Sequence, residues 1–147
     1  MKIQLRILVV EDQLPLLNSY KLILQHQGYH VAAAATFEEA REHLDRSDCD
    51  VLMCDLGLDG DGNGFDVIDY ACRRHPYIHP LLITGFVGDE VRQAARQRGI
   101  KVLHKPVGVA NLLHILTTIE SQLALHTPPR ASLETKAKDP EFSSRAG

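Results

Sequence analysis

The sequence predicts an α/β fold in which a parallel sheet is covered by helices on both faces. Short apolar runs alternate five times with longer segments whose apolar residues recur at helical spacing. Four of the five runs end in charged or hydroxyl side chains, at the edge where open parallel sheets gather their polar groups. The length of 147 residues suits a single domain whose core needs neither disulfides nor a structural metal.

The first part of the chain supplies two strands and two helices. The run Arg6 to Val10 is apolar on both faces, which predicts a central strand. A helix follows from about Leu14 to Gln27, with Pro15 in its first turn. A weaker strand over His30 to Ala34 precedes a second helix, which ends at Arg46 and opens with a capping box of threonine and glutamate.

The middle of the chain repeats this order. A third strand over Val51 to Cys54 ends at a carboxylate, and a loop rich in glycine and aspartate over residues 56–63 leads to a helix from Gly64 to Arg74. Two His-Pro pairs stop this helix. The fourth strand, Leu81 to Ile83, ends in a Thr-Gly pair.

The last third predicts one more strand between two helices. We expect Asp89 to cap a helix that runs through Arg98. The strand Val102 to His104 then delivers a Lys-Pro pair, and a final helix runs from about Gly108 to Leu125. Leu113 and Ile115 widen the apolar stripe of this helix beyond a single core contact, which leaves homodimerisation through it open.

The composition changes beyond residue 126. The final 21 residues contain three prolines, three serines and two threonines, and their only large apolar side chains are Leu133 and Phe142. Such a segment cannot bury enough apolar surface to offset its conformational entropy. We therefore expect a folded domain over residues 1–126 and a disordered or poorly ordered tail over residues 127–147.

Charge and cysteine content exclude several classes of protein. A net charge of −3 gives no broad basic surface for nucleic acid. No stretch approaches the roughly 20 apolar residues of a membrane span, and charges interrupt the first residues, so we expect a cytoplasmic protein. The odd number of cysteines, Cys49, Cys54 and Cys72, supports neither a disulfide framework nor a zinc site, and we expect buried thiols.

Three carboxylates are expected at the carboxyl edge of the sheet. Glu11 and Asp12 follow the first strand, and Asp55 ends the third. Converging carboxylates raise each other's cost of ionisation unless a cation neutralises them. Carboxylate and carbonyl oxygens are the ligands that Mg²⁺ prefers, with Mn²⁺ as a substitute. The sequence therefore predicts a magnesium site in which Glu11 and Asp12 hold the metal.

A phosphoryl group would complete this site. The metal and Lys105 could each hold one phosphate oxygen, and the hydroxyl of Thr84 could donate to a third. Asp55 is the best placed carboxylate to act as a nucleophile and carry the phosphoryl group as an acyl phosphate.

Four segments, taken in order, resemble the signature blocks of receiver domains (CheY-like) in the response regulators of two-component signalling: Ile7-Leu8-Val9-Val10-Glu11-Asp12, Asp55-Leu56-Gly57-Leu58, Ile83-Thr84-Gly85 and Lys105-Pro106. Each block alone is weak, but all four at successive strand ends are specific. The resemblance covers residues 5 to 125.

The resemblance implies both fold and chemistry. The expected fold is a flavodoxin-like (βα)5 sandwich with strand order 2-1-3-4-5. Asp55 would accept a phosphoryl group from a histidine kinase or a histidine phosphotransfer protein. The backbone carbonyl of Gly57 would join Asp55 as a metal ligand, Thr84 would act in switching, and the bond between Lys105 and Pro106 is a candidate cis peptide.

The chain departs from the family pattern in three places. Asp59 and Asn63 stand where the family usually has proline and glycine after the phosphorylated aspartate. Val102 occupies the position of the usual switch aromatic, three residues before the lysine. Gly57 and Phe86, two residues after Asp55 and Thr84, carry no carboxylate or amide that could orient attacking water, which predicts slow autodephosphorylation.

The resulting interpretation is a stand-alone receiver that signals through protein contacts with an unknown downstream partner. It would be no enzyme beyond its own metal-dependent phosphorylation and dephosphorylation. Alternatives within the family are the receiver of a hybrid kinase and a phosphorelay or phosphate-sink module. Outside it stand an aspartyl-phosphate phosphohydrolase, which needs a second acid where this chain has Gly57, a flavodoxin-like cofactor binder, and a phosphorylation-independent interaction module.

Overall fold

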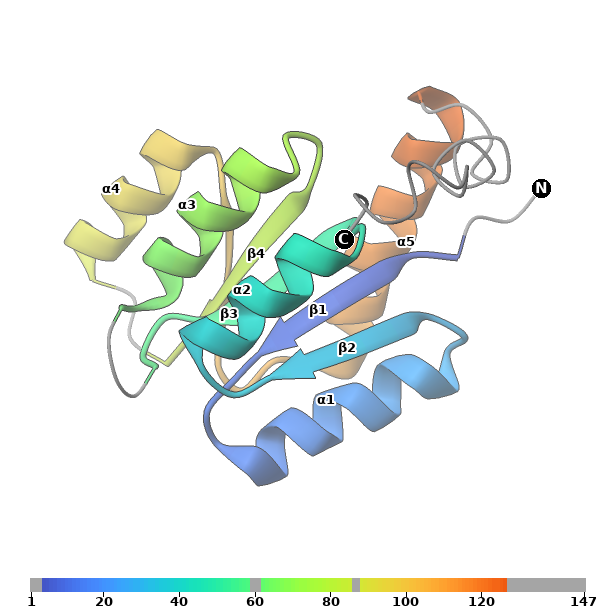
Figure 1. Cartoon of the computed structure of the whole chain (residues 1–147), viewed down its shortest axis with the longest axis horizontal. Helices are drawn as coiled ribbons and strands as arrows, with labels where there is room; N and C mark the ends of the chain where they lie inside the picture. Colours follow the sequence, from blue (N-terminus) through green and yellow to red (C-terminus); the bar gives the residue numbers. More distant parts are fainter. Residues whose placement is uncertain (1–3, 59–61, 86–87, 127–147) are drawn as a thin grey trace.

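A computed structural model of the chain describes residues 4–58, 62–85 and 88–126. Strands and helices alternate through these residues (Figure 1). The strands are β1 (Arg6–Val10), β2 (His30–Ala34), β3 (Val51–Asp55), β4 (His79–Thr84) and β5 (Lys101–His104). The helices are α1 (Leu14–His26), α2 (Phe37–Arg46), α3 (Gly64–Arg74), α4 (Asp89–Arg98) and α5 (Val109–His126).

The strands form one parallel sheet in the order β2-β1-β3-β4-β5. β1 and β3 lie in register, with Ile7 opposite Val51, and β3 continues the register into β4, with Asp55 opposite Ile83. The flavodoxin-like order expected from the resemblance is confirmed. All carboxyl ends of the strands therefore lie at one edge of the sheet.

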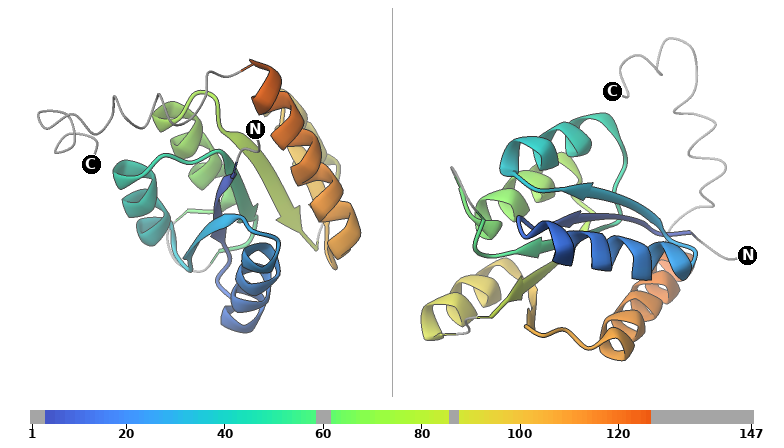
Figure 2. Two further views of the ribbon diagram at one scale, coloured as in Figure 1. Left: turned by 90° about the vertical axis from the view of Figure 1, so that its right-hand side faces the viewer. Right: turned by 90° about the horizontal axis from the view of Figure 1, so that it is seen from below.

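Alternate residues of the strands face two separate hydrophobic layers. In β3, Val51 and Met53 pack with α1 and α5, whereas Leu52 and Cys54 pack with residues of α2, α3 and α4. Each of these four side chains is fully buried. The left view of Figure 2 shows α2 and α5 on opposite sides of the strands. This arrangement explains why the central strands read as continuous apolar runs.

The fourth strand begins two residues earlier than predicted and includes Pro80. The N–H of His79 donates to the carbonyl of Asp50 at 2.9 Å, so this residue already pairs toward β3. β5 pairs with β4 only from Leu81 onward. The missing N–H of Pro80 therefore removes no ladder hydrogen bond, which is why a proline is tolerated there.

Two details of the helices also differ from expectation. The cap of α4 is Gly88, and Asp89 is the first helical residue, where its carboxylate still favours the positive end of the helix dipole. On α5, Leu113 and Ile115 pack into the core layer shared with α1, so they do not form the outward apolar surface that left dimerisation open. The expected tail, residues 127–147, lies outside the described residues.

The three thiols differ in exposure. Cys54 is buried and Cys49 is partly buried, but Cys72 on α3 is exposed, which corrects the expectation that all three are buried. Desolvation raises the pKa of Cys49 to about 12 and also raises the pKa of Cys54. Among the described residues, no helix combines the length and apolar character needed to cross a membrane.

The start of α3 lies directly against the backbone at the end of β3. Asn63 caps the helix by accepting from the N–H groups of Phe65 and Asp66 at 2.9 and 3.2 Å. The N–H of Gly64 donates to the carbonyl of Leu56 at 2.8 Å. A Cβ atom on Gly64 would lie 2.5 Å from the carbonyl oxygen of Asp55. Only glycine permits this close approach.

Replacing Gly64 with alanine should therefore separate α3 from β3. The new methyl group meets backbone atoms that cannot rotate away, so we expect Gly64→Ala to lower the free energy of unfolding by about 2 kcal/mol. Urea denaturation would measure the change. Gly108→Ala is the matched control, because nothing lies within 4 Å of its added Cβ, and it should change stability by less than about 0.5 kcal/mol. Equal stability of the two variants would contradict the steric explanation.

Candidate functional site

The residues singled out by the sequence lie at the carboxyl edge of the sheet. Glu11 and Asp12 follow β1, Asp55 is the last residue of β3, Thr84 is the last of β4, and Lys105 follows β5. Because all five strands are parallel, these side chains come from neighbouring strand ends although they are distant in sequence.

Three carboxylates meet at this edge. Glu11, Asp12 and Asp55 each place a carboxylate oxygen within 4.8 Å of the others. Glu11 is 1% exposed and Asp55 is 8% exposed, so two of the three are largely removed from water. The cluster concentrates negative charge where solvent screens it weakly. Such a cluster requires positive charge nearby.

Lys105 supplies that charge. Its Nζ lies 3.1 Å from Oε1 of Glu11 and 3.4 Å from Oδ2 of Asp55. Desolvation alone would lower the pKa of Lys105, but the hydrogen bond to Glu11 and the negative charges of Asp55 and Glu11 raise the pKa above its usual value. The ammonium group therefore stays protonated and joins two of the carboxylates.

Glu11 is held by donors on both carboxylate oxygens. Oε1 accepts from Lys105, and Oε2 accepts from the backbone N–H of Gln13 at 3.1 Å. Burial is the largest influence on its pKa and raises it above the usual value, although the contacts with Gln13 and Lys105 act in the opposite direction. The orientation of Glu11 is thus set by the turn that follows β1.

Thr84 and Val102 lie at the β4–β5 side of the site. Thr84 is 4% exposed, and its carbonyl oxygen accepts from the N–H of Lys105 at 2.9 Å. This hydrogen bond ties the ends of the two strands together. Val102 lies opposite Leu82 and is partly buried in the layer shared with α4. The peptide bond between Lys105 and Pro106 is cis, as expected.

The residues after Asp55 are only partly described. Gly57 is exposed, and a Cβ atom on it would have no neighbour within 4 Å. Asp59 and Phe86, two of the noted departures from the family pattern, lie outside the described residues. Asn63 has a structural role, because its side chain caps the N-terminus of α3.

Sequence reasoning missed two residues that shape the site. The N–H of Gln13 orients Glu11, and Gly64 lets α3 approach the backbone of Asp55. The part of Gln13 could not be predicted from the sequence, because its backbone N–H makes the contact and any residue other than proline has this group. Gly64 stood at a predicted helix start, but a close approach between distant segments cannot be read from a single glycine.

This donor set fits a hard divalent cation. It offers carboxylate oxygens from two strand ends, with no cysteine or histidine among the clustered groups. Mg²⁺ binds through one or two carboxylates and keeps several waters, which suits an open edge of a sheet. The Lys105 ammonium lies beside the same carboxylates, so this edge of the sheet combines oxygen ligands suited to a cation with a fixed positive charge.

Curated proteins are similar to this chain in sequence. The alginate biosynthesis transcriptional regulatory protein AlgB of Pseudomonas aeruginosa is 32% identical over 102 residues, which cover 69% of this chain and 22% of AlgB. The response regulator protein PilR of the same species is 26% identical over 143 residues, which cover 88% of this chain and 32% of PilR. The chain thus spans about a third or less of the length of these two relatives.

Solved structures share the fold. A CheY-like response regulator receiver domain protein from Methanospirillum hungatei superposes with a TM-score of 0.79 at 25% identity, covering 85% of this chain and all of that one. The non-phosphorylated receiver domain of HemR from Leptospira biflexa superposes with a TM-score of 0.73 at 29% identity, covering 86% of this chain and 98% of that one.

A family-wide match agrees with the site and the fold. The sequence model of the response regulator receiver domain matches residues 7–117, which include β1 from its second residue onward, the other four described strands and each of the clustered side chains. Through this match, the acidic cluster and the strand order, the chain belongs to the response regulator receiver domain family.

Proposed function

We propose that the protein is a magnesium-dependent phosphoacceptor and that Asp55 is the residue that becomes phosphorylated. The observation that carries this proposal is the contact between the Lys105 ammonium and Asp55, whose atoms are 3.4 Å apart. Asp55 is also one of the three clustered carboxylates. Lys105 offers a fixed cation to phosphoryl oxygens, and the carboxylates offer ligands to a metal. A carboxylate between these two features is placed to attack phosphorus.

Each residue of the site takes a separate part. Asp12 and Asp55, with the carbonyl of Gly57, would bind Mg²⁺, or Mn²⁺ in its place, and Glu11 would add a further oxygen while it orients Lys105. When bound, the metal supplies positive charge that stabilises the transferring phosphoryl group. Lys105 would bind one phosphoryl oxygen, and the Thr84 hydroxyl would donate to another.

The proposed phosphoryl donor is a phosphohistidine on a histidine kinase or a histidine phosphotransfer protein. A carboxylate oxygen of Asp55 forms a bond to phosphorus while the phosphorus–nitrogen bond breaks. The electron pair of the broken bond stays on the imidazole nitrogen, which takes up a proton. No turnover of an external substrate follows, so the protein acts as a signalling domain that promotes only its own phosphorylation and dephosphorylation.

We propose that the phosphorylated domain signals through contact with a downstream protein. The proposal extends to either setting of the domain, as a stand-alone protein or as a receiver within a hybrid kinase or phosphorelay. The curated relatives named above are longer than this chain, and their names describe a response regulator and a transcriptional regulator. The acidic site is equally suited to each setting.

Acetyl phosphate provides a direct test of the phosphoacceptor. Incubation with acetyl phosphate and Mg²⁺ should add the mass of one phosphoryl group to the wild type, as measured by intact mass spectrometry. Asp55→Asn should gain nothing, because an amide cannot form the acyl phosphate. Asp50→Asn is a control with another aspartate near the far end of the same strand. Equal mass gains in wild type and Asp55→Asn would exclude Asp55 as the acceptor.

Removal of Lys105 should separate metal binding from phosphoryl transfer. In Lys105→Met the carboxylates lose an opposing positive charge, so affinity for Mg²⁺ should rise, while the rate of phosphorylation should fall roughly a hundredfold. Titration with Mg²⁺ and the time course of mass gain measure the two effects. Lys101→Met changes an exposed lysine at the start of β5, the strand that Lys105 follows, and should leave both unchanged. A normal phosphorylation rate in Lys105→Met would contradict the assigned part of Lys105.

With glycine at position 57, the phosphorylated state should live longer than with a side chain that can orient water. It provides no side chain that could orient water for attack on phosphorus, and the space beside it is open. Gly57→Asn should therefore shorten the half-life of the phosphorylated protein, whereas Gly57→Ala, which adds bulk without an amide, should not. Loss of the added mass after removal of acetyl phosphate measures both. A wild-type half-life of seconds would refute the predicted slow dephosphorylation.

A further inference from the structure

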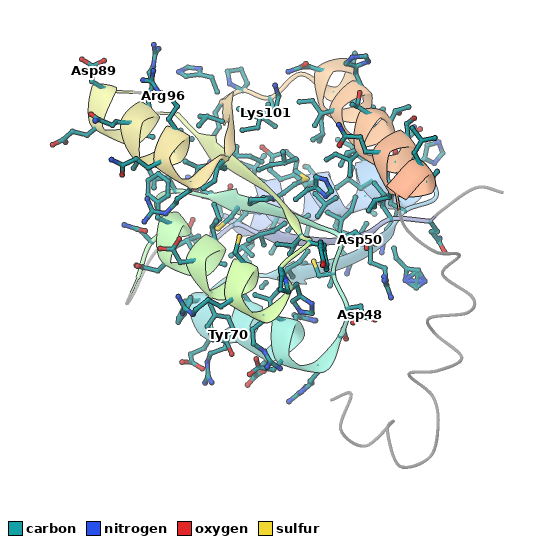
Figure 3. All side chains as sticks on the ribbon, turned by 90° about the horizontal axis from the view of Figure 1, so that it is seen from above. Asp48, Asp50, Tyr70, Asp89, Arg96 and Lys101 are labelled. Atoms are coloured by element: carbon teal, nitrogen blue, oxygen red, sulfur yellow. The ribbon has the colours of Figure 1, made fainter. Side chains whose placement is uncertain are left out.

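Charge is distributed unevenly among the described helices. Leaving histidines aside, α1 has one charged residue in 13 and α5 has one in 18, namely Lys21 and Glu120. By contrast, six of ten residues are charged in α2, four of eleven in α3 and five of ten in α4. Figure 3 shows two of these, Asp89 and Arg96, projecting outward from α4. The nearly uncharged surface of α1 and α5 therefore sets these two helices apart.

The two uncharged helices cover the same side of the sheet. Leu17 and Leu24 of α1 pack into one core layer with Leu112 and Leu116 of α5. The right view of Figure 2 shows α1 and α5 on the side of the sheet opposite α2. We call their outward surface, formed by the exposed side chains of residues 14–26 and 109–125, the α1–α5 face.

The α1–α5 face contains both apolar projections and an apolar groove. Leu22 is 66% exposed and Leu125 is 78% exposed, although leucine side chains favour burial. A groove of about 400 Å³ between the helices is lined mainly by apolar residues, among them Leu16, Ile23, Val109 and Leu112. Leu113 and Ile115 belong to the core layer instead, so other residues form this face.

The groove is close to electrically neutral. Lys105 is the one charged residue that lines it, and the ammonium group is already in contact with Glu11 and Asp55. A partner recognised by its charge would therefore find little opposite charge on the α1–α5 face. The groove is suited to uncharged side chains.

Two properties of the α1–α5 face fit a second copy of this chain. A two-fold interface must be complementary to itself, and this face offers projecting leucines together with a groove that can receive them. Each molecule carries a net charge of −3, and a contact through the uncharged helices keeps the charged helices of two copies apart.

The face is also large enough for a specific dimer. At about 1.5 Å per residue, α1 and α5 are roughly 20 and 27 Å long, and two adjacent helices are roughly 20 Å wide. Two such faces in contact would bury on the order of 1,000 Å² in total, which is near the lower limit for a specific interface. We therefore expect a dissociation constant of roughly micromolar size.

We propose that the unphosphorylated protein forms a two-fold dimer in which the α1–α5 faces of two copies pack against each other. Leu22 of each copy lies against the groove of the other. Depletion of charged residues is typical of the buried centre of a protein interface, and it explains the composition of these two helices. The contact needs neither a metal nor a phosphoryl group, so this inference does not rest on the proposed phosphorylation of Asp55.

Sedimentation equilibrium of the full chain, without phosphoryl donor or added metal, tests the dimer. Between about 1 and about 300 µM protein, the mass of the wild type should rise from 16.4 kDa toward twice that value. Leu22→Glu and Ser121→Glu each place a charge on one helix of the face, at exposed positions where the core is left intact. Each should raise the dissociation constant of the dimer by about tenfold or more, because the new charge is buried without a partner.

Tyr77→Glu is the matched control. It introduces the same charge at a side chain that is 89% exposed and lies between α3 and β4, outside the α1–α5 face. This variant should dimerise as the wild type does. Circular dichroism checks that all three variants are folded.

The outcomes decide the inference independently of the proposed function. A wild type that stays at 16.4 kDa throughout this range overturns the dimer and leaves the α1–α5 face to a different protein. Equal dimerisation of the wild type, Leu22→Glu and Ser121→Glu also overturns it, because the dimer would then use another surface. Mass gain with acetyl phosphate is measured separately, so failure of the phosphoacceptor and failure of the dimer are distinguishable.

Discussion

The site depends on the placement of one ammonium group among carboxylates that would otherwise repel each other. Lys105 contacts Glu11 and Asp55, and both are largely removed from water. The three groups come from three strand ends, so the parallel sheet must form before their charges can offset each other. A chain that placed one strand in another position would leave buried charge without a partner, at a considerable free-energy cost. The polar edge therefore helps to specify strand order as well as chemistry.

The apolar layers support this edge from both sides. β3 alternates its side chains between the α1–α5 layer and the α2–α4 layer, so the backbone that carries Asp55 is fixed from two directions. The close approach of Gly64 to the carbonyl group of Asp55 adds a third constraint on this backbone. A reacting carboxylate needs such a fixed backbone, because small displacements lower the efficiency of group transfer. The packing of the core therefore also determines the geometry of the site in this domain.

The sequence predicted the five strands, the five helices and the clustered side chains, because strand ends are local features that parallel pairing brings to one edge. It was less informative where backbone or distant partners decide. The start of β4 was not predicted because a proline, Pro80, is unfavourable inside a strand. The pairing with β5, which begins at Leu81, shows that the missing N–H of Pro80 is not needed. In the sequence, Arg98 marks only the predicted end of a helix, yet it pairs with Asp69, 29 residues away on α3. Such a partner is set by how two helices pack.

The uneven exposure of the thiols makes α3 chemically distinct. Cys49 and Cys54 are shielded, and their raised pKa values leave almost no thiolate at neutral pH. Cys72 is the most accessible of the three thiols, although partial desolvation and the charge of Asp69 raise its pKa. A maleimide dye or spin label would therefore attach to the native chain at a single place, beside the helix pair α3–α4. The protein already contains a handle for spectroscopy of that region, and no engineered cysteine is required.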